Sequence, residues 1–222
     1  GAAILIAELR APELLAASDV TLVLEEGIGL VTCSVRHRPN QGPRASFALP
    51  ALPMPVPQER DFNVAGIAAA LGLEPQDIGF DNHEILSFSA GIPFTFVPLA
   101  SAEAMARAKV QPTNFEAAIG PAAFLYSRSV VQQGHSFHAR MFAPGYGIAE
   151  DPATGSAAAA FAGVVMQFEN LHDGEHGLVI EQGFAMGRPS LITLSLEIAG
   201  GELASAAIGG AAVMVMQGII DV

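Results

Sequence analysis

Short segments rich in hydrophobic residues recur along the chain, and Gly- and Pro-rich stretches separate them. β-branched and aromatic residues are frequent in these segments, which is typical of strands. The predicted strands are residues 20–24, 30–36, 45–49, 84–89, 93–98, 122–131, 136–142, 177–182, 190–198, 203–208 and 211–217. We therefore expect a large, mostly antiparallel sheet.

Two predicted helices are apolar on every side. Residues 2–9 have only Glu8 as a polar interruption, and residues 156–168 form the second apolar helix. A helix without a polar face belongs inside a protein, and a curved sheet wrapped around it would supply the walls. The pattern predicts an α+β fold of two pseudo-equivalent, barrel-like, mostly antiparallel sheets, each wrapped around a central apolar helix.

A proline-rich stretch separates two predicted domains. Its prolines are Pro50, Pro53, Pro55 and Pro57. Prolines so spaced cannot lie in a helix or a central strand, so we interpret the stretch as a linker. Residues 1–57 are the expected remainder of an N-terminal domain, rejoined by residues 211–222, and residues 58–210 form the C-terminal domain.

Two further helices are predicted beyond the linker. They cover residues 61–71 and residues 101–109, and Asp61 is a plausible N-cap of the first. Both lie within the expected C-terminal domain.

Composition narrows the possible partners. Hydrophobic residues make up 51% of the 222 residues, charged residues make up 14%, and the net charge is −12. An acidic protein is not attracted to nucleic acid or to an anionic membrane surface. No apolar run reaches the roughly 18–20 residues that span a bilayer. The single cysteine, Cys33, excludes an intrachain disulfide and fits a reducing cytoplasm.

The segment from Arg140 to Ala160 carries the most chemical information. Its sequence is RMFAPGYGIAEDPATGSAAAA, a strand followed by a Gly- and Pro-containing loop and then a helix. Thr154, Gly155 and Ser156 fall where the helix begins and its first N–H groups lack partners, so this position can seat a carboxylate. Asp151 would lie close enough to act on a carbon beside that carboxylate. The alternative is that Asp151 or Thr154 only caps the helix.

The run Glu150-Asp151-Pro152-Ala153-Thr154-Gly155-Ser156-Ala157 resembles the signature of the PhzF-like family, which is named for phenazine biosynthesis. Further blocks resemble this family in the same order: Gly91-Ile92-Pro93-Phe94, Arg140-Met141-Phe142-Ala143-Pro144, Glu181-Gln182-Gly183, Met186-Gly187-Arg188-Pro189-Ser190 and Ile208-Gly209-Gly210-Ala211-Ala212-Val213. The resemblance implies the diaminopimelate-epimerase fold and an isomerase that moves a proton without metal or cofactor.

The resemblance also assigns roles to residues of the loop. It implies that Asp151 lines the active site and acts in catalysis, and that Gly155 and Ser156, next to Thr154, contact the substrate carboxylate. A homodimer is expected from the resemblance alone. We expect an isomerase or epimerase acting on a small carboxylate-bearing metabolite. The alternative is a degenerate relative or a fragment that binds small molecules without catalysis.

The front of the chain departs from the family pattern. Family members carry an acid/base glutamate in an S-E-T-like motif and a histidine in a G-H-P-T-x-G motif. The start Gly1-Ala2-Ala3-Ile4 resembles the last glycine of the histidine motif and the helix after it, so both residues are expected upstream of Gly1. No other segment matches these motifs. We interpret Glu150 as a solvated loop acid and not as a substitute for the glutamate.

Three other motifs are set aside. His172-Asp173-Gly174-Glu175-His176 matches an inverted zinc-protease pattern, but its Asp-Gly is a turn signal where that motif needs a helix. Gly145-x-Gly147 is only half of a dinucleotide fingerprint. Cys33 lies in the middle of a predicted strand and is expected to be inert packing, so a two-cysteine racemase is excluded.

Overall fold

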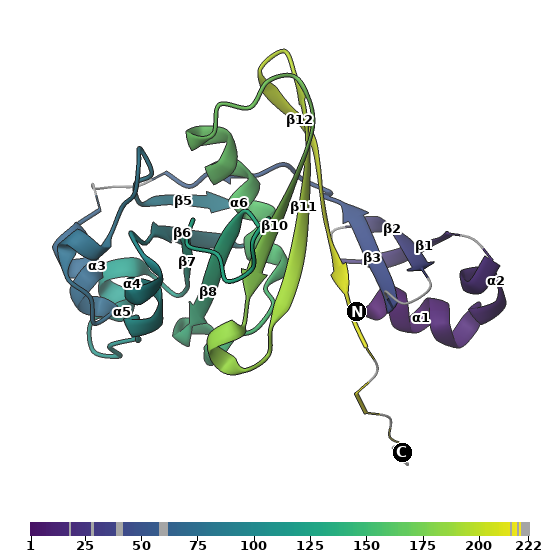
Figure 1. Ribbon diagram of the computed structural model, residues 1–222, viewed down its shortest axis with the longest axis horizontal. Helices are drawn as coiled ribbons and strands as arrows, with labels where there is room; N and C mark the ends of the chain where they lie inside the picture. Colours follow the sequence, from purple (N-terminus) through teal and green to yellow (C-terminus); the bar gives the residue numbers. More distant parts are fainter. Residues whose placement is uncertain are drawn as a thin grey trace.

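The structure is a computed structural model that describes residues 1–17, 19–27, 29–38, 42–57, 62–213, 215–216 and 218 (Figure 1). Its helices are α1 (Ala2–Arg10), α2 (Pro12–Ala17), α3 (Val64–Ala70), α4 (Ala102–Arg107), α5 (Phe115–Ile119) and α6 (Gly155–Phe168). Its strands are β1 (Val20–Glu26), β2 (Gly29–Arg38), β3 (Gly42–Ala48), β4 (Met54–Pro55), β5 (Leu86–Ser89), β6 (Pro93–Pro98), β7 (Ala123–Ser127), β8 (Phe137–Ala143), β9 (Ile148–Asp151), β10 (Gly174–Gln182), β11 (Ser190–Ala199) and β12 (Glu202–Ala211). None of the helices in these residues is long and apolar enough to cross a membrane.

The strands form one hydrogen-bonded sheet in the order β1-β2-β3-β12-β11-β10-β8-β7-β6-β5-β4, and β9 pairs with β8 beside this path. All pairs are antiparallel except β6 with β7 and β8 with β10. The predicted α+β class and the mostly antiparallel pairing are therefore confirmed. The strands are not separated into two sheets, because β12 pairs with β3. This pairing joins a smaller part of the molecule, which contains α1, α2 and β1 to β3, to a larger part, which contains β4 to β12 and α3 to α6.

Helix α6 is the centre of the larger part. It contacts β4, β5, β6, β11 and β12, and every residue from Ala157 to Val165 is buried. Gly163 shows how closely the sheet approaches the helix, since a Cβ there would lie 2.3 Å from Cδ1 of Phe88. Small side chains on this helix let the strands close around it, and the prediction of a central helix over 156–168 is confirmed.

Helix α1 lies against β1, β2 and β3, next to α2 (Figure 1). It buries Ala3, Ile4 and Ala7 on these strands. Leu9 on its other side is 61% exposed. The prediction of a helix at 2–9 is confirmed, but within the described residues this helix is covered on one face only.

Several predicted boundaries are wrong. The helix placed at 61–71 begins at Val64, and Asn63 caps it by accepting the Gly66 N–H at 3.1 Å; Asp61 lies outside the described residues. A single strand, β12, covers the strand placed at 203–208 and ends at Ala211, so the strand placed at 211–217 is wrong in the described residues beyond Ala211. The glycines that suggested a turn lie within β12, where a Cβ on Gly209 would come within 2.8 Å of the Ala45 carbonyl oxygen. These glycines permit close strand approach and do not end the strand.

Other elements differ in smaller ways. Within the proline-rich stretch, Met54 and Pro55 pair with β5 at the edge of the sheet, a position where proline is tolerated. The short elements α2, α5 and β9 were not predicted. The division into residues 1–57 and 58–210 remains a prediction, and most of residues 214–222 lie outside the described residues.

Candidate active site

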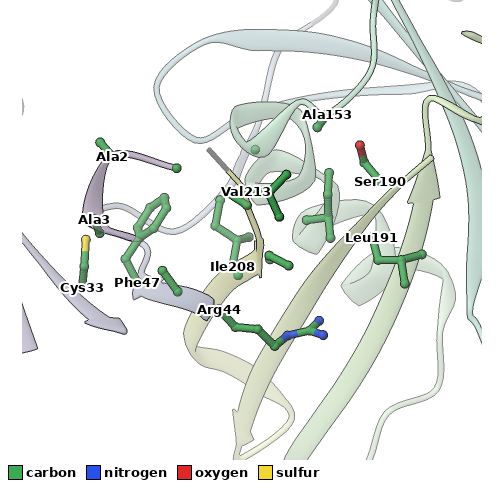
Figure 2. Close-up of a pocket in the computed structure, with 18 of the residues that line it drawn as sticks. Ala2, Ala3, Cys33, Arg44, Phe47, Ala153, Ser190, Leu191, Ile208 and Val213 are labelled. Atoms are coloured by element: carbon green, nitrogen blue, oxygen red, sulfur yellow. The ribbon is translucent and has the colours of Figure 1, made fainter. Parts of the chain in front are cut away.

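A cavity of about 820 Å³ lies between the two parts of the molecule. Its wall is mostly apolar, and Figure 2 shows Phe47, Ile208, Leu191 and Val213 around it. The residues that line it come mainly from the start of α1, from β1, β2, β3, β11 and β12, and from the start of α6. Helices α1 and α6 therefore present their N-terminal residues to the same cavity, with Gly1 to Ala3 on one side and Gly155 on the other.

The beginning of α6 is open for a ligand. Thr154 occupies the N-cap position but its side chain makes no capping hydrogen bond. The first bond of the helix runs from the Ala158 N–H to the Thr154 carbonyl. In the described part of the chain, the N–H groups of Gly155, Ser156 and Ala157 have no acceptor. Three unpaired donors at the positive end of a helix favour an anion.

A buried glutamine organises the loop before α6. Gln182, at the end of β10, is fully buried and donates from Nε2 to the Asp151 carbonyl at 2.7 Å and to Thr154 Oγ1 at 2.9 Å. Its Oε1 accepts the Thr154 N–H at 3.2 Å. Because Oγ1 already accepts from Gln182, the Thr154 hydroxyl donates to Asp151 Oδ2, at 2.6 Å. The Thr154 hydroxyl therefore orients the Asp151 carboxylate and does not cap the helix.

An ion pair fixes the same loop from the other side. Arg140 on β8 donates from Nε and Nη2 to the two carboxylate oxygens of Glu150 at 2.8 and 2.9 Å. Its Nη1 donates to the carbonyls of Met105 and Ala108 near the end of α4. The interpretation of Glu150 as a solvated loop acid is wrong, since its carboxylate is held by a buried arginine. This bidentate ion pair fixes Glu150, the residue directly before Asp151.

The predicted site residues occupy different environments. Gly155 lines the cavity, and a Cβ there would lie 3.2 Å from Cδ1 of Ile208. Thr154 is buried behind it, Asp151 is half-buried, and Ser156 is exposed. The structure thus brings Asp151 and Thr154 into direct contact and places the backbone of Gly155 at the cavity wall. The side chains of Asp151 and Ser156 are not among those that line the cavity.

Three residues of this site were not predicted. Gln182 stood in a block that resembled the family, but sequence alone gave it no role. Arg44 and Arg188 border the cavity from β3 and from the loop before β11. Neither forms an ion pair with any residue that the structure describes. Arg188 lies beside the loop that leads into α6, because its carbonyl oxygen and that of Pro152 lie 2.4 and 2.8 Å from the Cβ position of Gly183. Its positive charge increases the attraction for an anionic ligand there.

The other candidate groups form no metal site in the described residues, and of them only Cys33 lines the cavity. Within the described residues no three His, Cys, Asp or Glu side chains are grouped to hold a metal ion. His172 and His176 do not lie in a helix, and Nε2 of His176 donates to the His172 carbonyl at 2.7 Å. Cys33 is buried on β2, as predicted, and burial raises the pKa of its thiol. A raised thiol pKa fits inert packing.

Comparison with known proteins agrees with this architecture. The model of the PhzC-PhzF family, described as phenazine biosynthesis-like protein, matches residues 2–218. An uncharacterized isomerase of Mesorhizobium japonicum is 46% identical over 226 residues, which cover 98% of this chain and 72% of that protein. A trans-2,3-dihydro-3-hydroxyanthranilate isomerase of Pseudomonas chlororaphis is 36% identical over 87 residues, 39% of this chain and 31% of that protein.

Solved structures show the same fold. A PhzF-family protein of Bacillus anthracis superimposes with a TM-score of 0.80 at 21% identity, covering 93% of this chain and 70% of that one. A hydroxyproline epimerase from Agrobacterium vitis gives a TM-score of 0.53 at 13% identity, covering 95% of this chain and 61% of that one. With a family match over nearly its whole length and isomerases among its relatives, the chain belongs to the PhzC-PhzF family and is an isomerase with the epimerase fold.

Proposed function

We propose that this protein moves a proton on a small carboxylate-bearing metabolite by acid/base catalysis, without a metal or organic cofactor. One observation carries the proposal. The uncapped start of α6 opens at Gly155 onto the cavity, and the Asp151 carboxylate is held three residues before the N-cap. A helix end that seats a carboxylate beside a positioned acid/base group suits proton transfer at a neighbouring carbon.

The proposed reaction begins with the substrate carboxylate on the N–H groups of Gly155 and Ser156. Asp151 takes a proton from a carbon alpha to, or conjugated with, that carboxylate. The electron pair of the broken C–H bond spreads into the carboxylate, where the helix N–H groups stabilise the developing negative charge. The proton then returns to another carbon or to the opposite face of the same carbon. Asp151 is thus the proposed catalytic residue, and Thr154 and Gln182 are positioning residues.

The cavity wall supports a small and partly apolar substrate. Phe47, Ile192 and Ile208 line it, and the apolar surface excludes water from the reacting carbon. Arg188 at its border favours an anionic substrate over a neutral one. A homodimer and a cytoplasmic location remain part of this proposal.

A binding protein without turnover is the second candidate. It is favoured by one observation, since the side chain of Asp151 is not among those that line the cavity. The two candidates share the carboxylate seat and differ only in whether a proton is exchanged.

Exchange with solvent deuterium distinguishes them. Small carboxylic acids with an acidic α or conjugated C–H, including a dihydro-hydroxyanthranilate, would be incubated with the protein in D₂O and followed by proton NMR. We expect deuterium to enter the substrate. Metal chelators should not lower the exchange rate, and exchange should not require added nicotinamide or flavin. Saturable binding without any exchange would favour the binding protein, and a requirement for metal would overturn the cofactor-free mechanism.

A further inference from the structure

A second cavity, of about 360 Å³, lies on the face of the sheet that points away from α1. On β2 and β3, Cys33, Val35 and Phe47 turn toward α1. Successive side chains of a strand point to opposite faces, so the residues between them turn away. The side chains that line the second cavity are nearly all polar: Ser34, Arg36, Arg44, Ser46, Thr193 and Ser195.

Strand register gathers these side chains into one row. Ser34 pairs with Ser46, Ser46 pairs with Gly209, and Gly209 pairs with Thr193, across β2, β3, β12 and β11. At Gly209 a Cβ would lie 2.9 Å from Thr193 Oγ1 and 3.0 Å from Ser46 Cβ, so the absence of a side chain there lets these two flanking side chains approach each other. The recess lies along this row next to Gly210, and the side chains of Ser34, Ser46, Thr193 and Ser195 border it.

Two arginines face each other beside this row. Arg36 and Arg44 are register partners on β2 and β3, and both line the recess. Like charges directly opposite on a sheet repel. Asp19 pairs with Arg36 at 3.1 Å, but no carboxylate in the described residues pairs with Arg44. No acidic residue lines the recess, although the chain carries a net charge of −12.

The hydroxyl groups of the recess are also available. The side chains of Ser34, Ser46, Thr193 and Ser195 form no hydrogen bond with any residue in the part of the chain that the structure describes. The recess offers guanidinium and hydroxyl donors, and no carboxylate lines it. Such a recess matches an oxyanion with several acceptor oxygens.

We propose that this recess binds a phosphate group, with Arg36 and Arg44 as its cationic ligands and the Ser34, Ser46, Thr193 and Ser195 hydroxyls as donors. Free phosphate and the phosphate group of a small organic molecule present the same kind of oxygens to these donors. Arg44 and Gly210 border this recess and the larger cavity as well. The phosphate site therefore lies directly behind the candidate active site, on the other side of the strands that join the two parts of the molecule. This proposal does not depend on the proposed reaction.

Calorimetric titration with sodium phosphate, at constant ionic strength set by chloride, tests the site in the whole chain. We expect one saturable phosphate per chain. Arg44→Gln and, separately, Thr193→Val should each weaken binding by about tenfold or more, because each removes a donor to a charged group. Arg10→Gln removes an exposed arginine from α1, on the other side of the sheet, and should leave the affinity unchanged.

The second arm uses glycerol phosphate in place of inorganic phosphate. Tighter binding of the ester than of the free ion assigns the site to an organic phosphate, and equal or weaker binding assigns it to the free ion. Thermal unfolding of each variant shows whether it is folded, and Thr193→Val replaces a hydroxyl by a methyl group of nearly the same size. Absence of saturable binding, or equal affinity in wild type, Arg44→Gln and Thr193→Val, overturns the proposal.

Discussion

The hydroxyl of Thr154 donates to Oδ2 of Asp151 across 2.6 Å, although Thr154 stands at the N-cap of α6, where a threonine usually accepts from the helix. Gln182 sets this direction by donating to the same hydroxyl oxygen. The consequence is twofold: the carboxylate of Asp151 is oriented, and the first N–H groups of α6 remain open toward a ligand.

Asp151→Asn tests the carboxylate itself. Asparagine keeps the size of the side chain and an oxygen that can accept from Thr154, but it cannot take up a proton. We expect kcat to fall by about 10²–10⁴-fold with little change in unfolding free energy. Steady-state kinetics and urea denaturation measure the two effects. Unchanged kcat would limit Asp151 to a structural role in the loop.

Gln182→Leu tests the positioning network. The fully buried amide makes three hydrogen bonds to Asp151 and Thr154, and its loss leaves buried polar groups without partners. We expect the unfolding free energy to fall by about 1–3 kcal/mol, and kcat to fall more than KM rises because the carboxylate loses its orientation.

The matched control for this change is Ser205→Ala. Ser205 donates to Glu197 at 2.9 Å on the exposed side of the sheet. Its removal should change the unfolding free energy by less than about 0.5 kcal/mol and leave kcat unaffected. If Gln182→Leu alters stability while kcat stays at the wild-type value, Gln182 does not position the catalytic carboxylate.

Ser156→Val tests the carboxylate seat. The change removes a hydroxyl from the second residue of α6 and places a β-branched group at the open helix end. We expect the Kd of a carboxylate ligand to rise about tenfold, as for the loss of a hydrogen bond to a charged group, while stability changes little because Ser156 is exposed. Calorimetry with an aromatic carboxylic acid measures the affinity. Equal affinity of variant and wild type would remove Ser156 from the seat.

Gly163→Ala tests the packing around α6. The added methyl group would overlap the ring of Phe88, whose Cδ1 lies 2.3 Å from the position of the new carbon. Overpacking of this kind costs about 1–3 kcal/mol, and we expect this loss or a larger one in urea denaturation. Gly177→Ala on β10 has nothing within 4 Å of its new carbon and serves as the control. Equal stability of both variants would show that the sheet does not close on α6.

The pH dependence of stability should follow two histidines, the buried His83 and the half-buried His138. Burial lowers the pKa of His83, which lies 3.0 Å from the Tyr126 hydroxyl, and burial likewise lowers the pKa of His138. Below the ordinary histidine pKa of about 6.5, the unfolded chain therefore binds more protons than the folded one. The contribution of the two neutral histidines to the unfolding free energy is fully present above pH 6.5. It is lost as the pH falls through their lowered folded-state pKa values.

Two measurements check this expectation. The NMR titration midpoints of His83 and His138 should fall below 6.5, and the unfolding free energy should fall between pH 6.5 and pH 5, above the range in which ordinary carboxylates titrate. Midpoints at or above 6.5 would contradict it.

The sequence by itself determined the type of fold and the place of the site. The all-apolar run 156–168 required walls on every side, and the structure supplies them with β4, β5, β6, β11 and β12. The run from Glu150 to Ala157 indicated the loop and the helix start, and the structure joins Asp151 to Thr154 there. Both features are local, because periodicity and neighbouring residues in the sequence are sufficient to define them.

Only the tertiary structure decided the partners that come from distant segments. Gln182 reaches Thr154 across 28 positions of the chain, and Arg140 reaches the carbonyl of Met105 across 35, contacts that no local pattern encodes. The glycines of β12 suggested a turn because glycine is favoured in turns, and only the pairing with β3 showed that Gly209 permits close approach. The row of hydroxyls and arginines on the outer face likewise exists only because strand register aligns β2, β3, β12 and β11.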